Sequence, residues 1–159
     1  MGETEQLDAL AIGAHPDDVE ITSGGLIIKM TKMGRRVGVL DMTQGETGTH
    51  GDENDRAREA QAAAKVMGLV YRHNLKLPDS GLMLTQENRL KVAQVIRDTK
   101  PELLILPHWE QRHPDHRVTT EIGYDACFLA GLKKADLDGE PHRPRKIIYA
   151  SYFRNREYS

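Results

Sequence analysis

A single cysteine, Cys127, occurs among the 159 residues, so no disulfide can form within the chain. That scarcity favours a reducing compartment. No apolar run approaches the roughly 18 residues of a membrane-spanning helix, and the N-terminus has no apolar core of a signal peptide. The net charge of −2 provides no broad positive surface for nucleic acid. These absences predict a cytoplasmic protein that binds neither membranes nor nucleic acid.

What is present is an ordinary globular composition, with 38% hydrophobic and 29% charged residues. A chain of this length and composition fits one domain, residues 1–159, with a sizeable core. Cys127 lies in the apolar run Ala126–Leu132 and is expected to be a core residue.

Apolar runs typical of buried strands alternate with segments of helical periodicity. The expected strands are Leu7–Ala14, Arg36–Met42, Tyr71–Leu75, Leu103–Pro107 and Ile147–Tyr152. The expected helices are Ile21–Met33, Asp55–Met67, Thr85–Thr99 and Val118–Lys134. This alternation predicts an α/β fold with a mostly parallel sheet flanked by helices on both faces. Ligands of such sheets bind at the carboxyl ends of the strands.

The first expected strand runs into His15-Pro-Asp-Asp-Val-Glu20. A dinucleotide-binding fold would carry G-x-G-x-x-G there, so a nucleotide-binding module is a weak alternative. The histidine and two carboxylates suit a divalent cation, and a strand-to-helix turn can bring His15 and Asp18 together. A competing interpretation is that Asp17 and Asp18 only cap the positive end of the helix.

A second motif, His113-Pro-Asp-His116, follows the strand Leu103–Pro107 and is predicted at the same sheet edge, in a loop over 109–115. Catalytic zinc takes three protein ligands and keeps a fourth position for water, whose pKa falls to about 7. His15, Asp18 and His116 make such a set, and iron(II) or manganese are also compatible with it.

Three polar groups of the two motifs then remain beside the proposed ion. A carboxylate such as Asp17 can act as a general base, and His113 can stabilise an oxyanion and protonate a leaving amine. Asp115 can accept a hydrogen bond from a histidine and fix its tautomer.

Together the two motifs resemble those of the LmbE-like/PIG-L family of metal-dependent N-acetylglucosamine deacetylases. Residues 43–51, TQGETGTHG, resemble the glycine-rich loop of the branch acting in bacillithiol synthesis (N-acetylglucosaminyl-malate), and residues 56–59 and 78–81 match in order and spacing. The resemblance implies a Rossmann-like fold and hydrolysis of the N-acetyl amide of a small sugar conjugate.

By the same resemblance, zinc is held by His15, Asp18 and His116, with Asp17 as the base, His113 as the oxyanion stabiliser or acid, and Asp115 as the orienting aspartate. It also implies that Arg56 and Asp79 contact the sugar. The interpretations of Arg56 as a solvated charge and of Asp79 as a turn former stay open.

Family members continue for about another 60–70 residues, which often contribute to assembly, so the chain is expected to be truncated at its C-terminal end and a homo-oligomer is a candidate state. A second functional hypothesis follows: a metal-binding but inactive or incomplete member that forms part of an assembly.

Overall fold

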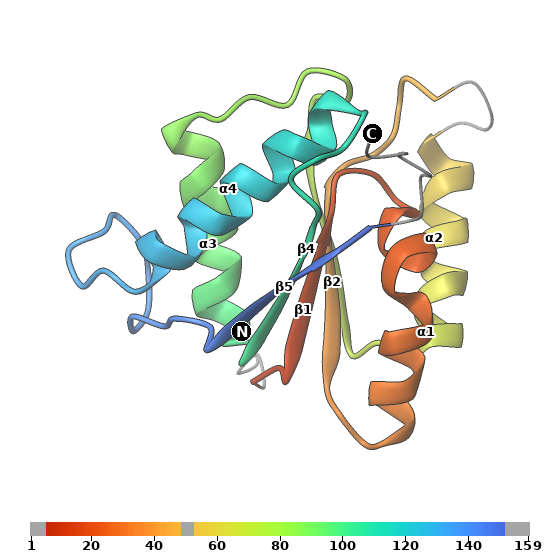
Figure 1. Cartoon of the computed structure of the whole chain (residues 1–159), viewed down its shortest axis with the longest axis horizontal. Helices are drawn as coiled ribbons and strands as arrows, with labels where there is room; N and C mark the ends of the chain where they lie inside the picture. The colour runs from red at the N-terminus through yellow and green to blue at the C-terminus, as the bar shows by residue number, and fades with distance from the viewer. Residues whose placement is uncertain (1–5, 49–52, 152–159) are drawn as a thin grey trace, which may run out of the picture.

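The computed structural model describes residues 6–48 and 53–151, and its elements follow the predicted alternation (Figure 1). The strands are β1 (Ala9–Gly13), β2 (Val37–Thr43), β3 (Tyr71–Leu77), β4 (Leu103–Pro107) and β5 (Lys146–Ala150). The helices are α1 (Asp18–Lys32), α2 (Glu53–Met67), α3 (Gln86–Thr99) and α4 (Pro114–Ala130). Tyr152 and positions 49–51 of the glycine-rich loop lie outside the described residues.

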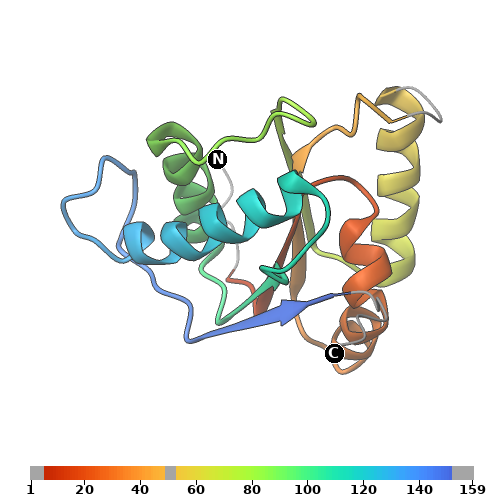
Figure 2. The ribbon, with the colours of Figure 1, turned by 45° about the horizontal axis from the view of Figure 1, so that its top comes forward.

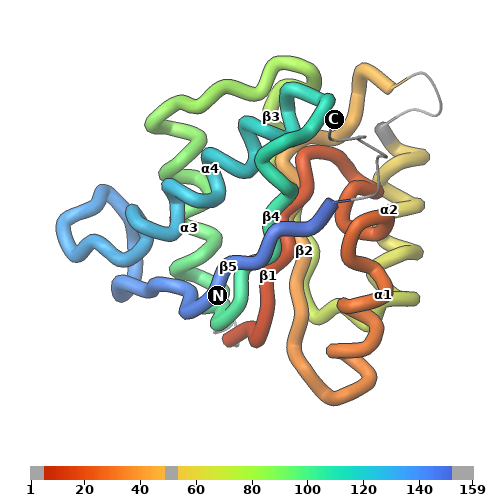
Figure 3. The backbone as a smooth tube through the Cα atoms, viewed as in Figure 1, coloured from red at the N-terminus to blue at the C-terminus, as the bar shows by residue number. Residues whose placement is uncertain are grey.

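The five strands form one parallel sheet in the order β3-β2-β1-β4-β5. The tube in Figure 3 shows β1 and β4 side by side at its centre. On one side of this pair the chain continues from β1 through β2 to β3, and on the other side it continues from β4 to β5. The order therefore reverses between β1 and β4, which is where open α/β sheets bind their ligands.

Helices cover both faces of the sheet, as predicted (Figure 2). Successive side chains of a strand point to opposite faces, so β1 contributes to two cores. Leu10 and Ile12 pack in the core formed with α3 and α4, whereas Ala9 and Ala11 pack in the core formed with α1 and α2. Cys127 is buried in the core formed with α3 and α4, as expected. Burial on both faces explains why β1 is a continuous apolar run.

The start of α4 differs from the prediction. The helix begins at Pro114, not at Val118, and ends at Ala130, not at Lys134. The Nδ1 atom of His113 accepts a hydrogen bond from the backbone N–H of Asp115 (3.2 Å), and a proline suits the first helical position because its φ is already fixed. The hydrophobic periodicity of α4 begins only at Val118, so it hides this polar first turn.

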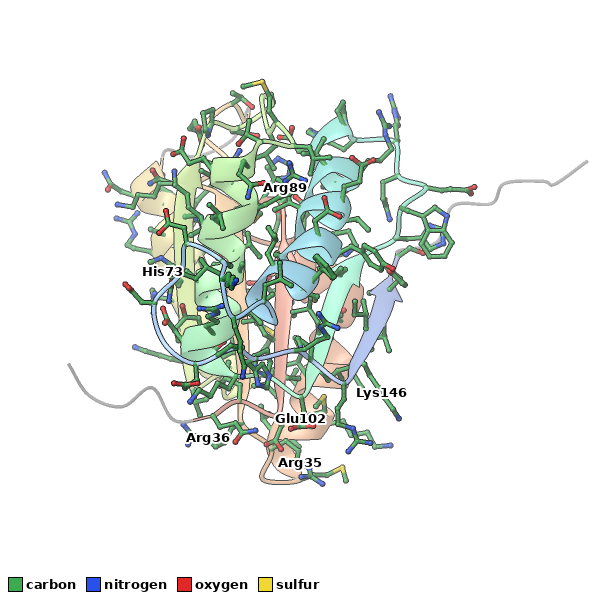
Figure 4. The ribbon with its side chains drawn as sticks, turned by 90° about the vertical axis from the view of Figure 1, so that its left-hand side faces the viewer. Arg35, Arg36, His73, Arg89, Glu102 and Lys146 are labelled. Carbon is green, nitrogen blue, oxygen red and sulfur yellow. The ribbon has the colours of Figure 1, made fainter. Side chains whose placement is uncertain are left out.

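The charged side chains labelled at the bottom of Figure 4 gather at the end of the sheet opposite the two histidine motifs. Arg36 precedes β2, Glu102 precedes β4 and Lys146 begins β5. They mark the amino ends of the strands, where sheets of this type do not bind ligands. Within residues 6–48 and 53–151, no helix has the length and apolarity that crossing a membrane requires.

Candidate metal centre

The first histidine motif occupies the turn between β1 and α1. Asp18 is the first residue of α1, and its Oδ2 accepts a hydrogen bond from the backbone N–H of His15 at 2.9 Å. The same oxygen lies 3.3 Å from Nδ1 of His15. Asp17 precedes the helix with a φ of 108°, a conformation that L residues rarely adopt, and its side chain makes no capping hydrogen bond. Asp17 thus occupies the N-cap position without a side-chain capping bond, and Asp18 lies in the first turn, so the favourable charge of both acids at the helix start remains compatible with the structure.

The second motif meets the first across the β1–β4 pair. Because α4 begins at Pro114, His116 lies in its first turn, directly above the end of β4. Its Nε2 atom is 3.1 Å from Oδ2 of Asp18. Figure 1 shows this first turn of α4 beside the turn that leads from β1 into α1, at the top of the view. The two motifs, far apart in the sequence, thus meet at the carboxyl edge of the sheet.

Ligand-type atoms of His15, Asp18 and His116 all lie within 4.8 Å of one another, a spacing that allows them to share one ion. Two imidazole nitrogens and a carboxylate oxygen are a donor set that zinc accepts, as do iron(II) and manganese(II). A second group in the described residues combines His15 with His113 and Asp115. Asp115 suits a ligand role less well, because its oxygens already accept hydrogen bonds from the backbone N–H groups of Ser80 and Leu82.

The charges of this cluster perturb its pKa values in opposite directions. Burial alone would lower the pKa of His15, but hydrogen bonding and charge from Asp18, with Asp79 and Asp115, raise it to about 9. Burial would raise the pKa of Asp18, yet the hydrogen bonds to His116 and His15 hold it well below its usual range. Asp18 is therefore ionised at neutral pH, and a cation would replace the proton on His15.

Two further carboxylates contact the other ring nitrogen of His15. Its Nε2 atom lies 2.9 Å from Oδ1 of Asp79 and 3.2 Å from Oδ2 of Asp115. A carboxylate at Nε2 holds the ring proton there and leaves Nδ1 free to face Asp18 and a cation. The orienting role expected for Asp115 has this geometry. Asp79, which was expected to contact the sugar, also contacts His15. The sequence did not predict this contact.

Asp17 and His113 flank the cluster without belonging to the three-residue ligand set. The side chain of Asp17 is 60% exposed, with Nη1 of Arg56 3.8 Å away. Partial burial and the charge of Asp18 raise the pKa of Asp17, whereas Arg56 opposes that rise. Partial burial, with the positive charges of His15 and His116, lowers the pKa of His113. An accessible carboxylate and a neutral imidazole thus stand next to the candidate ion.

Glycines of the loop after β2 shape the environment of Arg56. A Cβ atom added at Gly48 would collide with the guanidinium of Arg56, and one at Gly45 would come within 3.2 Å of its Cδ. Gly45 also has a φ of 68°. The absence of side chains at these positions therefore lets the loop pack closely against Arg56 as it is placed here. The glycine-rich pattern was the signal in the sequence for this contact.

Comparison with known proteins gives the same family as the motifs. The model of the family "PIG-L: GlcNAc-PI de-N-acetylase" matches residues 10–127. A diacetylchitobiose deacetylase of Thermococcus kodakarensis is 35% identical over an alignment 133 residues long, which covers 77% of this chain and 50% of that protein. The chain thus spans half the length of this relative.

Solved structures agree with the fold. A conserved protein of Thermus thermophilus, TT1542, has a TM-score of 0.90 and 38% identity, and the match covers 97% of this chain and 69% of that one. The N,N'-diacetylchitobiose deacetylase of Pyrococcus horikoshii has a TM-score of 0.82 and 25% identity, covering 92% of this chain and 60% of that one.

Proposed function

The chain belongs to the PIG-L (GlcNAc-PI de-N-acetylase) family, and we propose that it is a metal-dependent hydrolase that removes the acetyl group from an N-acetylglucosamine conjugate. The observation that carries this proposal is the convergence of His15, Asp18 and His116 on one point, beside an exposed carboxylate and a neutral imidazole. The names of the Thermococcus and Pyrococcus relatives, both diacetylchitobiose deacetylases, support the substrate class.

His15, Asp18 and His116 hold the ion in this proposal, with zinc as the first candidate and iron(II) or manganese as alternatives. When bound, such an ion polarises the amide carbonyl and makes a nearby water acidic enough to act near neutral pH. Every other part of the reaction falls to side chains of the chain itself.

Asp17 is the proposed general base. It is the carboxylate next to ligand Asp18, and its 60% exposure leaves it open to substrate and water. It takes the proton of the attacking water and can return it to the leaving amine, so the products are acetate and the free amine of the sugar.

His113 is the proposed oxyanion stabiliser or acid. Its Nδ1 accepts the N–H of Asp115, so in the neutral ring the proton lies on Nε2. The Nε2–H group is then a donor for the oxyanion that forms as water attacks the amide, or for the leaving nitrogen. The lowered pKa of His113 keeps the ring in this neutral donor form, which suits the oxyanion stabiliser; the role of acid requires the ring to be protonated first.

The described part of the glycine-rich loop, residues 43–48, would face the group attached to the sugar. The resemblance of the loop sequence to the bacillithiol branch supports an N-acetylglucosaminyl-malate conjugate, whereas relatives of the chain include a diacetylchitobiose deacetylase and a deacetylase of an N-acetylglucosaminyl-inositol. Arg56, held by the loop glycines and close to Asp17, is the proposed sugar contact.

The test is to incubate zinc-loaded protein with N-acetylglucosaminyl-malate, diacetylchitobiose and an N-acetylglucosaminyl-inositol, and to measure free amine and acetate in equal amounts. Asp17→Asn, which leaves all three ligands in place, is the matched control and should release neither product. Zinc binding without release of amine from any conjugate would reject the hydrolase and favour the inactive member of an assembly.

A further inference from the structure

Asp79 joins the candidate metal centre to the glycine-rich loop. Its Oδ1 lies 2.9 Å from Nε2 of His15. Its Oδ2 accepts hydrogen bonds from both the backbone N–H (2.8 Å) and the hydroxyl (2.7 Å) of Thr47. The side chain of Asp79 is only 4% exposed. Both carboxylate oxygens are thus engaged and covered, which leaves this side chain poorly placed to hold a sugar hydroxyl.

The turn that carries Asp79 is clamped from two sides. The backbone N–H of Asp79 donates to Oε1 of Glu46 at 2.8 Å, and the N–H of Ser80 donates to Oδ2 of Asp115 at 2.7 Å. Ser80 has a φ of 58°, a left-handed conformation that L residues rarely adopt and that persists only where surrounding contacts hold it. These contacts fix the position from which Asp79 reaches His15.

We propose that Asp79 is a positioning residue for the metal centre: its carboxylate, 2.9 Å from Nε2 of His15, helps to orient the ring beside Asp115, which makes the hydrogen bond to that nitrogen, and Thr47 holds Asp79 for that purpose. The inference rests on the metal-dependent function proposed above. A carboxylate on the distal nitrogen of a metal-binding histidine fixes the ring and makes its other nitrogen a stronger ligand. The position of loop residues 44–48 therefore affects the affinity of the metal site for zinc, although Thr47 is not one of the candidate ligands.

The test measures zinc affinity of the full chain by competition with a chelator, in the absence of any substrate. Asp79→Asn keeps the shape of the side chain but removes its charge, and should weaken zinc binding about 10- to 100-fold. Thr47→Val should weaken it by a smaller factor, of the order of threefold. The double variant should bind zinc no more weakly than Asp79→Asn alone, because both changes interrupt one chain of contacts.

Asp125→Asn is the matched control. Asp125 is a partly exposed carboxylate that pairs with Arg89 at 3.2 Å, outside the candidate ligand groups. The zinc affinity of this variant should equal that of the wild type. If Asp79→Asn fails to fold, Thr47→Val decides the question, since it removes one hydroxyl from a side chain of nearly the same shape.

Kinetics with the sugar conjugate at saturating zinc separate the two roles of Asp79. A positioning residue predicts that the loss in Asp79→Asn falls on kcat, with KM changed by less than about twofold. A sugar contact predicts a raised KM with unchanged zinc affinity, and that result, or unchanged zinc affinity in both single variants, would overturn the proposal. Wild-type protein that binds zinc without turnover contradicts only the hydrolase, whereas failure to bind zinc contradicts both.

Discussion

The Oδ2 atom of Asp18 lies 3.1 Å from Nε2 of His116, which joins the first strand-to-helix turn to the first turn of α4. Each residue alone has an ordinary interpretation, a helix-capping acid or a helix-start histidine. Their contact, with His15 on the same oxygen, makes the pair part of one candidate ion site.

Replacing His116 should abolish tight metal binding. His116→Ala removes one of three ligands, and the two that remain bind zinc weakly. We expect less than one zinc per chain after dialysis, measured by atomic absorption, with the circular dichroism spectrum retained. His113→Ala is the control and should keep its zinc while losing activity, because His113 lies outside the three-residue ligand set. Equal zinc content in the two variants would contradict this assignment.

Asp17→Asn should separate binding from chemistry. The amide keeps the size of the carboxylate but cannot take a proton, so kcat should fall about 10²- to 10⁴-fold. The zinc content should stay at the wild-type value, since Asp18 supplies the ligand oxygen. A rate within a few fold of wild type, measured by amine release, would remove Asp17 from the role of base.

The loop glycines predict a coupling with Arg56. Gly48→Ala places a Cβ against the guanidinium, so it should displace Arg56 and raise KM in the same direction as Arg56→Ala. The double variant should be no worse than Arg56→Ala, because the lost contact is the same one. Gly25→Ala, in open space on α1, is the control and should leave KM unchanged. If the two substitutions raised KM by fully additive amounts in the double variant, that result would contradict the contact between Gly48 and Arg56.

The raised pKa of His15 predicts opposite pH dependences with and without metal. Asp18, Asp79 and Asp115 overcome the effect of burial and raise this pKa to about 9, against about 6.5 in an unfolded chain. A raised pKa stabilises the metal-free fold fully below pH 6.5, and that contribution is lost as the pH rises to about 9. Zinc must displace the proton, so its affinity should rise about tenfold per pH unit over the same range.

Urea unfolding of the metal-free protein at pH 6.5, 7.5 and 8.5 measures how its unfolding free energy depends on pH. Zinc competition at the same pH values measures how zinc affinity depends on pH. His15→Gln should flatten the metal-free slope, whereas His113→Gln should leave it. A metal-free protein whose unfolding free energy rises between pH 6.5 and 9 would show that His15 is not held in its charged form.

A buried arginine should matter for stability without affecting the metal. Arg97 is 3% exposed and donates to the backbone carbonyls of Ala130, Leu132 and Leu137, among others, so it ties α3 to the segment after α4. Arg97→Leu leaves these carbonyls without their donor and should lower the free energy of unfolding by about 2–4 kcal/mol. Zinc affinity of the folded protein should not change, and a lower zinc affinity of the folded variant would contradict this division.

The sequence predicted the sheet and the meeting of the two histidine motifs for physical reasons that can be stated. Buried parallel strands such as β4 are continuous apolar runs, and both histidine motifs follow strands that end at one edge of the sheet. Periodicity could not locate the start of α4, because its first turn is polar. The placement of Asp79 on His15 was also beyond reach, since it depends on a backbone conformation at Ser80 that residue type does not encode.

X-ray absorption of the zinc-loaded protein tests the proposed ion site itself. The proposed site predicts one zinc per chain with two imidazole nitrogens and one carboxylate oxygen at about 2.0–2.2 Å, plus a light-atom ligand from solvent. In His116→Ala the spectrum should lose one imidazole, and in Asp17→Asn it should not change. A wild-type spectrum without histidine scattering, or one that His116→Ala leaves intact, would contradict the site on which the proposed function depends.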